Sequence, residues 1–163
     1  MIRKATAKDY DQVWEIFKSV IKTEDTYVFS KHTPKEDLKK HWFASYMHTY
    51  VYEANHEILG TYIVKPNQID LASHIANASY MVHANTQGKG IGRKLCEHSL
   101  KLAKDLGFIG MQFNIVVSTN GVAVKLWQKL GFEIIGTTPN GFRHSSLGLV
   151  DTFIMYKDLV SSE

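Results

Sequence analysis

The sequence is poor in cysteine. Its 163 residues include only one, Cys96, so no disulfide can form within the chain. This excludes a small secreted scaffold held together by disulfides and fits a reducing compartment, so we expect a cytoplasmic protein. A chain of this length with 44% hydrophobic residues can bury a core of its own, which predicts a single domain over residues 1–163.

Long hydrophobic runs are also absent. The longest stretch without Asp, Glu, Lys or Arg covers residues 106–124, and its three glycines and two asparagines help make it too polar for a bilayer span. The first 20 residues contain seven charged side chains, so they lack the apolar segment of a secretory signal. We therefore expect no contact with a membrane.

An excess of one charge is missing as well. The 19 Lys and Arg residues are scattered among 16 Asp and Glu residues, giving a formal net charge of +3. Nucleic-acid-binding proteins concentrate basic residues in a patch or stripe, so a nucleic-acid partner is not expected. The eight histidines form no His-x-x-x-His pair and there is no Cys-x-x-Cys, so we expect no metal site.

Hydrophobic periodicity predicts alternating strands and helices. The β-rich runs cover residues 2–5, 50–54, 58–64, 75–83, 111–117, 132–136 and 150–156. Helices are expected over residues 6–21, 33–47, 92–106 and 120–130. Because a helix joins the strands at 75–83 and 111–117, we expect these strands to be parallel neighbours. The pattern indicates an α/β domain with a mixed sheet of about seven strands and about four helices on its faces.

Two connections are expected to be loops. One covers residues 139–148. The other, residues 22–32, is polar but has Tyr27, Val28 and Phe29 in its middle. It is either a lid over a binding site or a hydrophobic tether.

The most informative segment is the turn from Gln87 to Arg93, between a strand and a helix. Gly88, Gly90 and Gly92 remove side chains that would keep an anion from the backbone, and the start of a helix offers unpaired N–H groups. A pyrophosphate would fit there. The spacing is neither that of a Rossmann fingerprint nor that of a P-loop, and an ordinary tight turn stays open as an alternative.

Two segments in this order resemble the GCN5-related N-acetyltransferase (GNAT) family. The strand at residues 79–82, followed by Gln87-x-x-Gly90-x-Gly92, resembles the family's Arg/Gln-x-x-Gly-x-Gly/Ala motif. About 30 residues later, the segment 120–132 resembles the family's Asn-x-x-Ala helix that ends in Gly-Phe. The resemblance implies a splayed mixed sheet and acetyl-coenzyme A (acetyl-CoA) as the cosubstrate.

The resemblance also implies where acetyl-CoA binds. Backbone groups around Val82 would hold the pantetheine arm, amides of residues 88–93 would hold the pyrophosphate, and Asn120 would bond the arm near the thioester. The implied cofactor-binding residues are Met81, Val82, His83, Gln87, Gly88, Lys89, Gly90, Ile91, Gly92, Arg93, Asn120 and Trp127.

A closer likeness is to the branch that contains azetidine-2-carboxylate, or proline-analogue, N-acetyltransferases. Residues 75–78, 113–116 and 118–120 resemble the three asparagine-bearing stretches of that branch. Asn77 and Asn114 would face the cleft from adjacent strands and hold a small polar acceptor. The alternative is that each caps a backbone group in the sheet. Asp25 is a further candidate for acceptor binding.

The groups that move protons are left open. Many family members carry a tyrosine where this chain has Trp127, whose indole N–H cannot act as a general acid. We expect Trp127 to pack beside the cofactor or in the core, and Asn120, through water, or Tyr80 to organise protonation if it is needed. His74 is the first candidate for the base. The others are Glu24, Asp25, Glu53 and Asp151, and for each a solvated surface charge is the alternative.

The leading hypothesis is a cytoplasmic enzyme that moves acetyl from acetyl-CoA to the amine of a small acceptor by direct attack in a ternary complex. The acceptor would be an amino acid or an analogue. A non-catalytic acyl-CoA-binding module and a protein or peptide N-acetyltransferase are the alternatives. A homodimer is a possible assembly.

Overall fold

A seven-stranded mixed sheet organises the protein, of which the computed structural model describes residues 1–160. The strands are β1 (Ile2–Lys4), β2 (His48–Ala54), β3 (Glu57–Pro66), β4 (Ile75–Val82), β5 (Gly110–Val117), β6 (Glu133–His144) and β7 (Gly148–Asp158), in the order β1-β2-β3-β4-β5-β7-β6. The helices are α1 (Tyr10–Ile21), α2 (Leu38–Trp42), α3 (Ile91–Asp105) and α4 (Gly121–Lys129). None of them is long and apolar enough to span a bilayer. The predicted fold class is confirmed.

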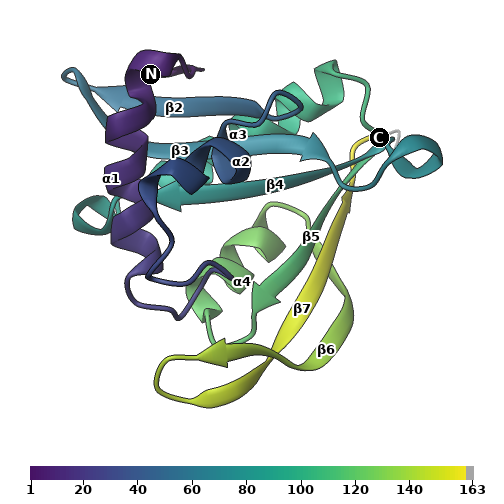
Figure 1. Ribbon diagram of the computed structural model, residues 1–163. Coiled ribbons are helices and arrows are strands. Elements are labelled where there is room, and N and C mark those ends of the chain that lie inside the picture. The colour runs from purple at the N-terminus through teal and green to yellow at the C-terminus, as the bar shows by residue number, and fades with distance from the viewer. Residues whose placement is uncertain (161–163) are drawn as a thin grey trace.

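The helices divide between the two faces of the sheet (Figure 1). Helices α1 and α2 bury one hydrophobic cluster with β2, β3 and Met81 of β4. Helices α3 and α4 pack on the other face, where a second cluster joins β3, β4, β5 and β7. Alternating side chains along β4 therefore enter different cores, as a strand covered on both faces requires.

The centre of the sheet is where β4 and β5 meet. They are parallel neighbours, as predicted, but pair only at Ile75 with Gly110 and at Ala76 with Met111. Beyond that point they separate, and β5 continues with β7 and β6 as a lower arm of the molecule (Figure 1). The sheet is thus splayed in its middle.

The second helix is shorter than its sequence suggests. It ends at Trp42 instead of residue 47. The Trp42 indole N–H donates to Thr61 Oγ1 at 2.9 Å, and the Trp42 carbonyl accepts from Thr49 Oγ1 at 2.6 Å. These buried contacts with β2 and β3 cap the helix, so tertiary packing overrides the local helical tendency.

The predicted loop at residues 139–148 is also different, because most of it is strand. β6 runs to His144 and pairs with β7 up to Gly148, leaving a short turn between them. A register shift between Thr138 and Phe142 accommodates Pro139, which has no N–H to donate. Pairing with β7 makes this proline-containing segment extended.

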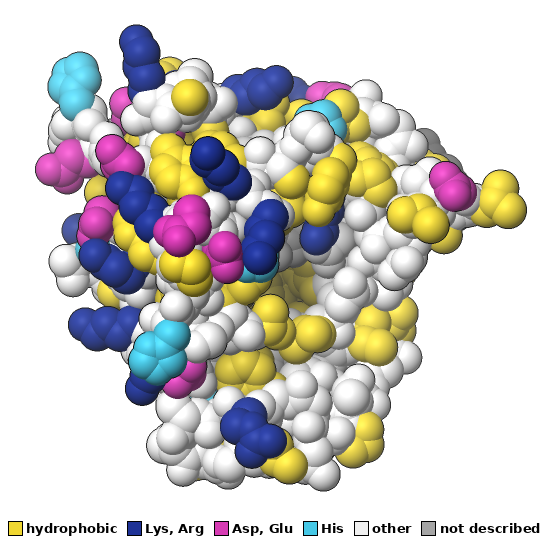
Figure 2. All heavy atoms as spheres, viewed as in Figure 1, with side chains coloured by type: hydrophobic (Ala, Val, Ile, Leu, Met, Phe, Trp, Pro, Cys, Tyr) yellow, Lys and Arg dark blue, Asp and Glu magenta, His cyan; other side chains and the backbone are white. Residues whose placement is uncertain are grey.

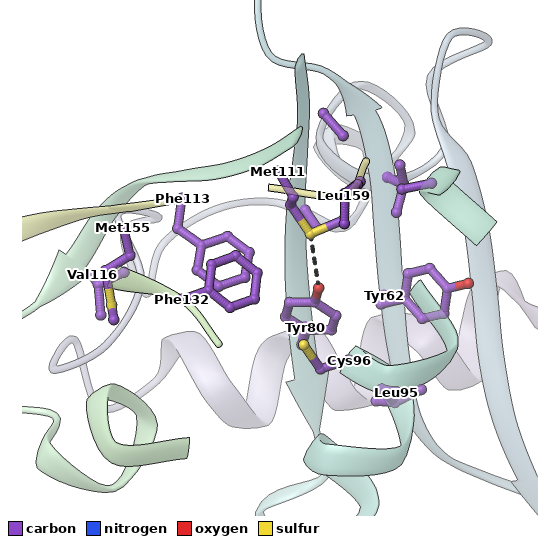
Figure 3. Close-up of a cluster of buried hydrophobic side chains, with 14 of the residues drawn as sticks. Tyr62, Tyr80, Leu95, Cys96, Met111, Phe113, Val116, Phe132, Met155 and Leu159 are labelled. Atoms are coloured by element: carbon purple, nitrogen blue, oxygen red, sulfur yellow. Dashed lines mark hydrogen bonds between the residues drawn. The ribbon is translucent and has the colours of Figure 1, made fainter. Parts of the chain in front are cut away.

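The aromatic core beneath β4 contains a buried polar group, the Tyr80 hydroxyl (Figure 3). It lies 2.6 Å from Ser99 Oγ and 3.5 Å from Met111 Sδ. Nearby, the rings of Phe113 and Phe132 stack with centroids 4.3 Å apart. Cys96 is fully buried in the same cluster, and this burial raises the pKa of its thiol to about 12. It is therefore a packing residue and no nucleophile, because thiolate is the reactive form.

The close approach of α3 to β3 depends on Gly60. A Cβ added there would lie 2.9 Å from Ile91 Cγ2 and 3.0 Å from Leu95 Cδ1, which belong to the first two turns of α3. We expect Gly60→Ala to lower the free energy of unfolding by about 1–3 kcal/mol, because it overpacks this contact. Urea unfolding followed by circular dichroism measures the change.

The control is Gly121→Ala, because a Cβ at Gly121 would meet nothing within 4 Å. Alanine favours a helix, so this variant should be neutral or stabilising. Equal effects of the two substitutions would contradict the close-approach argument.

Candidate functional site

The splay leaves one backbone edge of β4 unpaired. His83 N donates to Leu59 O and Asn67 N donates to Ile75 O, so the odd-numbered residues of β4 direct their backbone groups to β3. The even-numbered residues must direct theirs to the opposite side. Ala78, Tyr80 and Val82 therefore present N–H and C=O groups to the gap where β5 has separated.

A small cleft lies at this gap, with a volume of about 80 Å³. Its walls come from β4, β5, α4 and the α1–α2 connection. The lining residues are Thr26, Tyr27, Ala78, Ser79, Tyr80, Phe113, Ile115, Val116, Val117, Asn120, Ala123 and Trp127. The cleft is large enough for a few heavy atoms, so a larger ligand would place only its end there.

Tyr27 closes the cleft from the α1–α2 connection, and it was not among the predicted site residues. Its phenol lies against the Tyr80 backbone, and burial raises its pKa despite that contact. Two positions later, Phe29 packs on Phe17 with centroids 5.0 Å apart. The connection therefore unites both alternatives drawn from the sequence: Phe29 tethers it, and Tyr27 covers the cleft. The hydrophobic residues within a polar loop were the available signal.

Helix α4 supplies Asn120 and Trp127. Asn120 is the N-cap, and its Oδ1 accepts from Ala123 N at 3.3 Å. Seven residues later, on the same side of the helix, the Trp127 ring packs 5.1 Å from Tyr80 and 5.2 Å from Phe113. Both residues line the cleft, and Trp127 packs against the core there as expected.

The glycine turn forms an open backbone cradle at the start of α3. Gly88 and Gly90 have φ values of +83° and +76°, and a Cβ on either would point into open space. The first helical bond runs from Lys94 N to Gly90 O, so the amides of Ile91, Gly92 and Arg93 have no acceptor within the helix. Such a cradle suits an anionic group.

Gly92, in the first turn of α3, lies close to both β4 and α4. A Cβ added at Gly92 would lie 3.8 Å from Val82 Cγ2 and 3.9 Å from Leu126 Cδ2. Gly92 thus faces the space between β4 and α4. The predicted residues Val82, Gly90 and Gly92 lie together along one path that starts at the turn.

The other predicted residues of this segment are placed differently. The Met81 side chain is buried in the α1 cluster, and its backbone faces β3 instead of the gap. The His83 ring accepts from Asn85 N at 3.1 Å and so caps the turn. Arg93 pairs with Glu97 at 2.9 Å, while Gln87 and Lys89 are exposed. The Arg93 amide belongs to the cradle, but its guanidinium would reach an anion there only after a change of rotamer.

Asn77 and Asn114 do not line the cleft. Asn77 Nδ2 donates to Gln112 O at 2.9 Å, across the point where β4 and β5 begin to separate. Asn114 Nδ2 donates to Asn67 Oδ1 at 2.8 Å, and its Oδ1 accepts from Gln112 Nε2. Asn77 thus follows the alternative in which the asparagine caps a backbone group, because it bonds a β5 carbonyl that has no backbone partner on β4. Asn114 instead belongs to an exposed cluster of side-chain amides.

The candidate bases are likewise spread over the molecule. His74 is exposed before β4, four residues or roughly 13 Å along the chain from Ala78 of the cleft. Glu53 pairs with Arg3 at 3.0 Å, which lowers the pKa of Glu53, and Asp151 accepts from Asn140 N at 3.0 Å. The structure does not bring these three to the cleft.

Glu24 and Asp25 lie nearest to the cleft in sequence, directly before Thr26. Asp25 accepts from Thr23 Oγ1 at 2.6 Å. The Glu24 carbonyl accepts from Ser145 N at 3.1 Å and so ties this connection to the β6–β7 turn. Among residues 1–160, no His, Asp or Glu side chain lines the cleft itself.

Tyr80 cannot supply a proton to the cleft. Its hydroxyl is engaged with Ser99 in the core, and burial raises its pKa well above the usual value. Within residues 1–160, no three His, Cys, Asp or Glu side chains gather into a group that would hold a metal ion. The polar groups available at the cleft are backbone groups, the Asn120 amide and the hydroxyls of Thr26, Tyr27 and Ser79.

Comparison with known proteins identifies the family. The model of the acetyltransferase (GNAT) family matches residues 13–132. N-acetyltransferase aca1 of Schizosaccharomyces pombe is 36% identical over 98 residues, which cover 60% of this chain and 47% of aca1. The match therefore spans about half the length of that relative.

Solved structures agree over nearly the whole chain. A GCN5-related N-acetyltransferase from Kribbella flavida superposes with a TM-score of 0.92 at 35% identity, covering 97% of this chain and 96% of that one. The putative acetyltransferase yncA from Salmonella typhimurium, solved with its cofactor acetyl-CoA, shares the fold with a TM-score of 0.88 at 22% identity, covering 100% and 95% of the two chains. The family model covers most of the chain, and the glycine cradle and the splayed strands agree with it. The chain therefore belongs to the acetyltransferase (GNAT) family.

Proposed function

We propose that this protein transfers the acetyl group of acetyl-CoA to the amine of a small acceptor, an amino acid or an analogue such as a proline analogue, by direct attack in a ternary complex. The observation that carries the proposal is a path along β4: an anion cradle at the start of α3, Gly92 beside Val82 at the end of the strand, and a cleft with unpaired β4 backbone groups. A ligand with a diphosphate at one end and amides along its arm matches that path.

The residues that would hold acetyl-CoA follow from this path. The amides of residues 91–93 and the open backbone at Gly88 and Gly90 would bind the diphosphate. The Val82 backbone would pair with an amide of the arm, as an added strand would. Bound there, acetyl-CoA supplies a thioester as the acyl donor.

The cleft would stabilise charge on the acyl oxygen. The Tyr80 N–H points into the gap and is the backbone donor at the centre of the cleft. Tyr27 now lies against that backbone and would give way to the acyl oxygen or bond to it. Asn120 keeps its Oδ1 on the helix and so directs its NH₂ group, a second donor, toward solvent or the cleft.

Acetyl transfer in this cleft does not require a strong general acid. The attacking amine must be neutral, and a thiol with an ordinary pKa of about 8.5 is a tolerable leaving group without a strong acid. Because no carboxylate or imidazole of the described part of the chain lines the cleft, the amine proton would leave through water toward the α1–α2 connection. Asp25 is the proposed receiver, while His74 stays a prediction that its position does not favour.

The covering of the cleft favours a small acceptor over a peptide or protein. The α1–α2 connection covers the cleft with Tyr27 and is tied to the β6–β7 turn through Glu24 and Ser145. A peptide or protein would need an open trough at this point. The cytoplasm and a homodimer remain our proposals for compartment and assembly; the buried, unpaired Cys96 is the support for a reducing compartment.

Acetyl transfer is tested by following free thiol while the protein is mixed with acetyl-CoA and a panel of amines. The panel contains proline analogues, common amino acids, small diamines and peptides. We expect thiol release above background with amino acids. Release with peptides alone would favour a peptide acetyltransferase, and tight calorimetric binding of acetyl-CoA without turnover would favour a binding module. Either result would overturn the proposal.

The proposed route of the pantetheine arm is tested at Gly92. We expect Gly92→Leu to weaken acetyl-CoA binding about 10-fold or more, since a branched side chain would fill the space between Val82 and Leu126. Gly92→Ala is the matched control, because its Cβ makes only ordinary contacts and should leave binding within about 2-fold. Calorimetric titration gives both dissociation constants. Wild-type affinity in Gly92→Leu would place the arm elsewhere.

The proton receiver is tested by two substitutions. We expect Asp25→Asn to lower kcat about 10-fold or more, because a positioned base contributes at least that much, with the KM for acetyl-CoA unchanged. His74→Ala should stay near wild type, since His74 lies outside the cleft. Steady-state kinetics at saturating acetyl-CoA separates them, and the reverse pattern would return the role to His74.

A further inference from the structure

A polar strip crosses the sheet face beside the cleft. On β3, Thr61 contacts α2 and Ile63 is buried in the α1 cluster, so Lys65, two positions further, lies on the same face. Lys65 pairs with Asn77 of β4, whose amide reaches Gln112 O of β5. We define the polar strip as Lys65, Asn67, Asn77, Gln112 and Asn114.

The strip adjoins the cleft. Ser79, two residues after Asn77 on the same face of β4, is a lining residue of the cleft. The strip therefore begins roughly 7 Å from the cleft, within reach of a lysine side chain. Figure 2 shows a hollow in this face of the molecule, with basic, His and acidic side chains near its upper margin.

Lys65 is the only charged member of the strip. No carboxylate of residues 1–160 lies within 4.0 Å of its ammonium group, and the side chain is half-buried. The nearby Asp37 of the turn before α2 pairs with Lys40 at 3.5 Å. An uncompensated cation beside neutral amides is complementary to an anion, most of all to a carboxylate.

His41 supports this charge distribution. Burial is the main cause that lowers the pKa of His41. The charges of Lys40 and Lys65 lower this pKa further, and the charge of Asp37 raises it. The positive charge of Lys65 therefore reaches the end of α2. The ring of His41 packs on Phe29 with centroids 4.6 Å apart, next to the connection that carries Tyr27.

We infer that the polar strip is the subsite for a carboxylate of the acceptor, with Lys65 as its charged anchor. The inference rests on the proposed acetyl transfer. An acceptor whose amine lies in the cleft would place its carboxylate over Asn77 and Lys65. The protein thus selects amines that carry a carboxylate, such as amino acids, over neutral and purely cationic amines.

The experiment compares acids with their carboxamides. Proline, methionine and glutamate are assayed beside their α-carboxamides, prolinamide, methioninamide and isoglutamine, and kcat/KM is measured by thiol release. The wild type should prefer a carboxylate acceptor to its α-carboxamide about 10-fold or more, mainly through KM. Lys65→Gln should lose most of that preference without changing turnover of the amides, and Lys65→Arg should keep it.

Lys104→Gln, an exposed lysine at the end of α3, is the matched control and should behave as wild type. Thermal melting confirms that all variants are folded. An equal loss for acids and amides in Lys65→Gln overturns the subsite. Turnover of amides and simple amines but not of acids also overturns it while leaving acetyl transfer intact. No turnover of any acceptor overturns the proposed function itself.

Discussion

The separation of β4 from β5 is the constraint on which the site depends. Two parallel pairs hold the strands, and then the backbone groups of Ala78, Tyr80 and Val82 lose their ladder partners. A polar backbone group away from water must find another partner. At the closed end of the gap, the Asn77 side chain donates to the Gln112 carbonyl of β5. At the cleft, the Tyr27 hydroxyl contacts the Tyr80 backbone. The remaining edge is open to an extended ligand with amides of its own.

The rest of the molecule keeps this gap open and aligned. Gly60 lets α3 lie close to β3, which brings the amides of its first turn to the end of β4. On the other arm, Phe113, Phe132 and Trp127 pack as one aromatic group and fix α4 against β5. Because both arms are held by buried side chains, the cradle and the cleft keep their positions relative to one another. A site of this kind needs few charged side chains.

Much of the site could be predicted where local chemistry decides. The turn with Gly88 and Gly90 needs left-handed backbone, and both residues adopt it. The sequence places Asn120 at the start of a helix, and in the structure its side chain caps α4. His74 was a candidate because of its place before a strand, and Asn77 and Met81 were implied by the family resemblance. Neither argument tells which way each group points. A difference of one residue along a strand changes both the face and the hydrogen-bonding side.

The order of residues alone predicts the approximate positions of the strands, the glycine turn, the helix that begins at Asn120 and the family, because each is marked by a pattern of residues close together in the chain. Three-dimensional packing decides the rest. It ends α2 at Trp42, extends β6 through Pro139, brings Tyr27 over the cleft and turns Asn77 into a bridge to β5. Each of these outcomes depends on a partner distant in the chain, so no local pattern carries it.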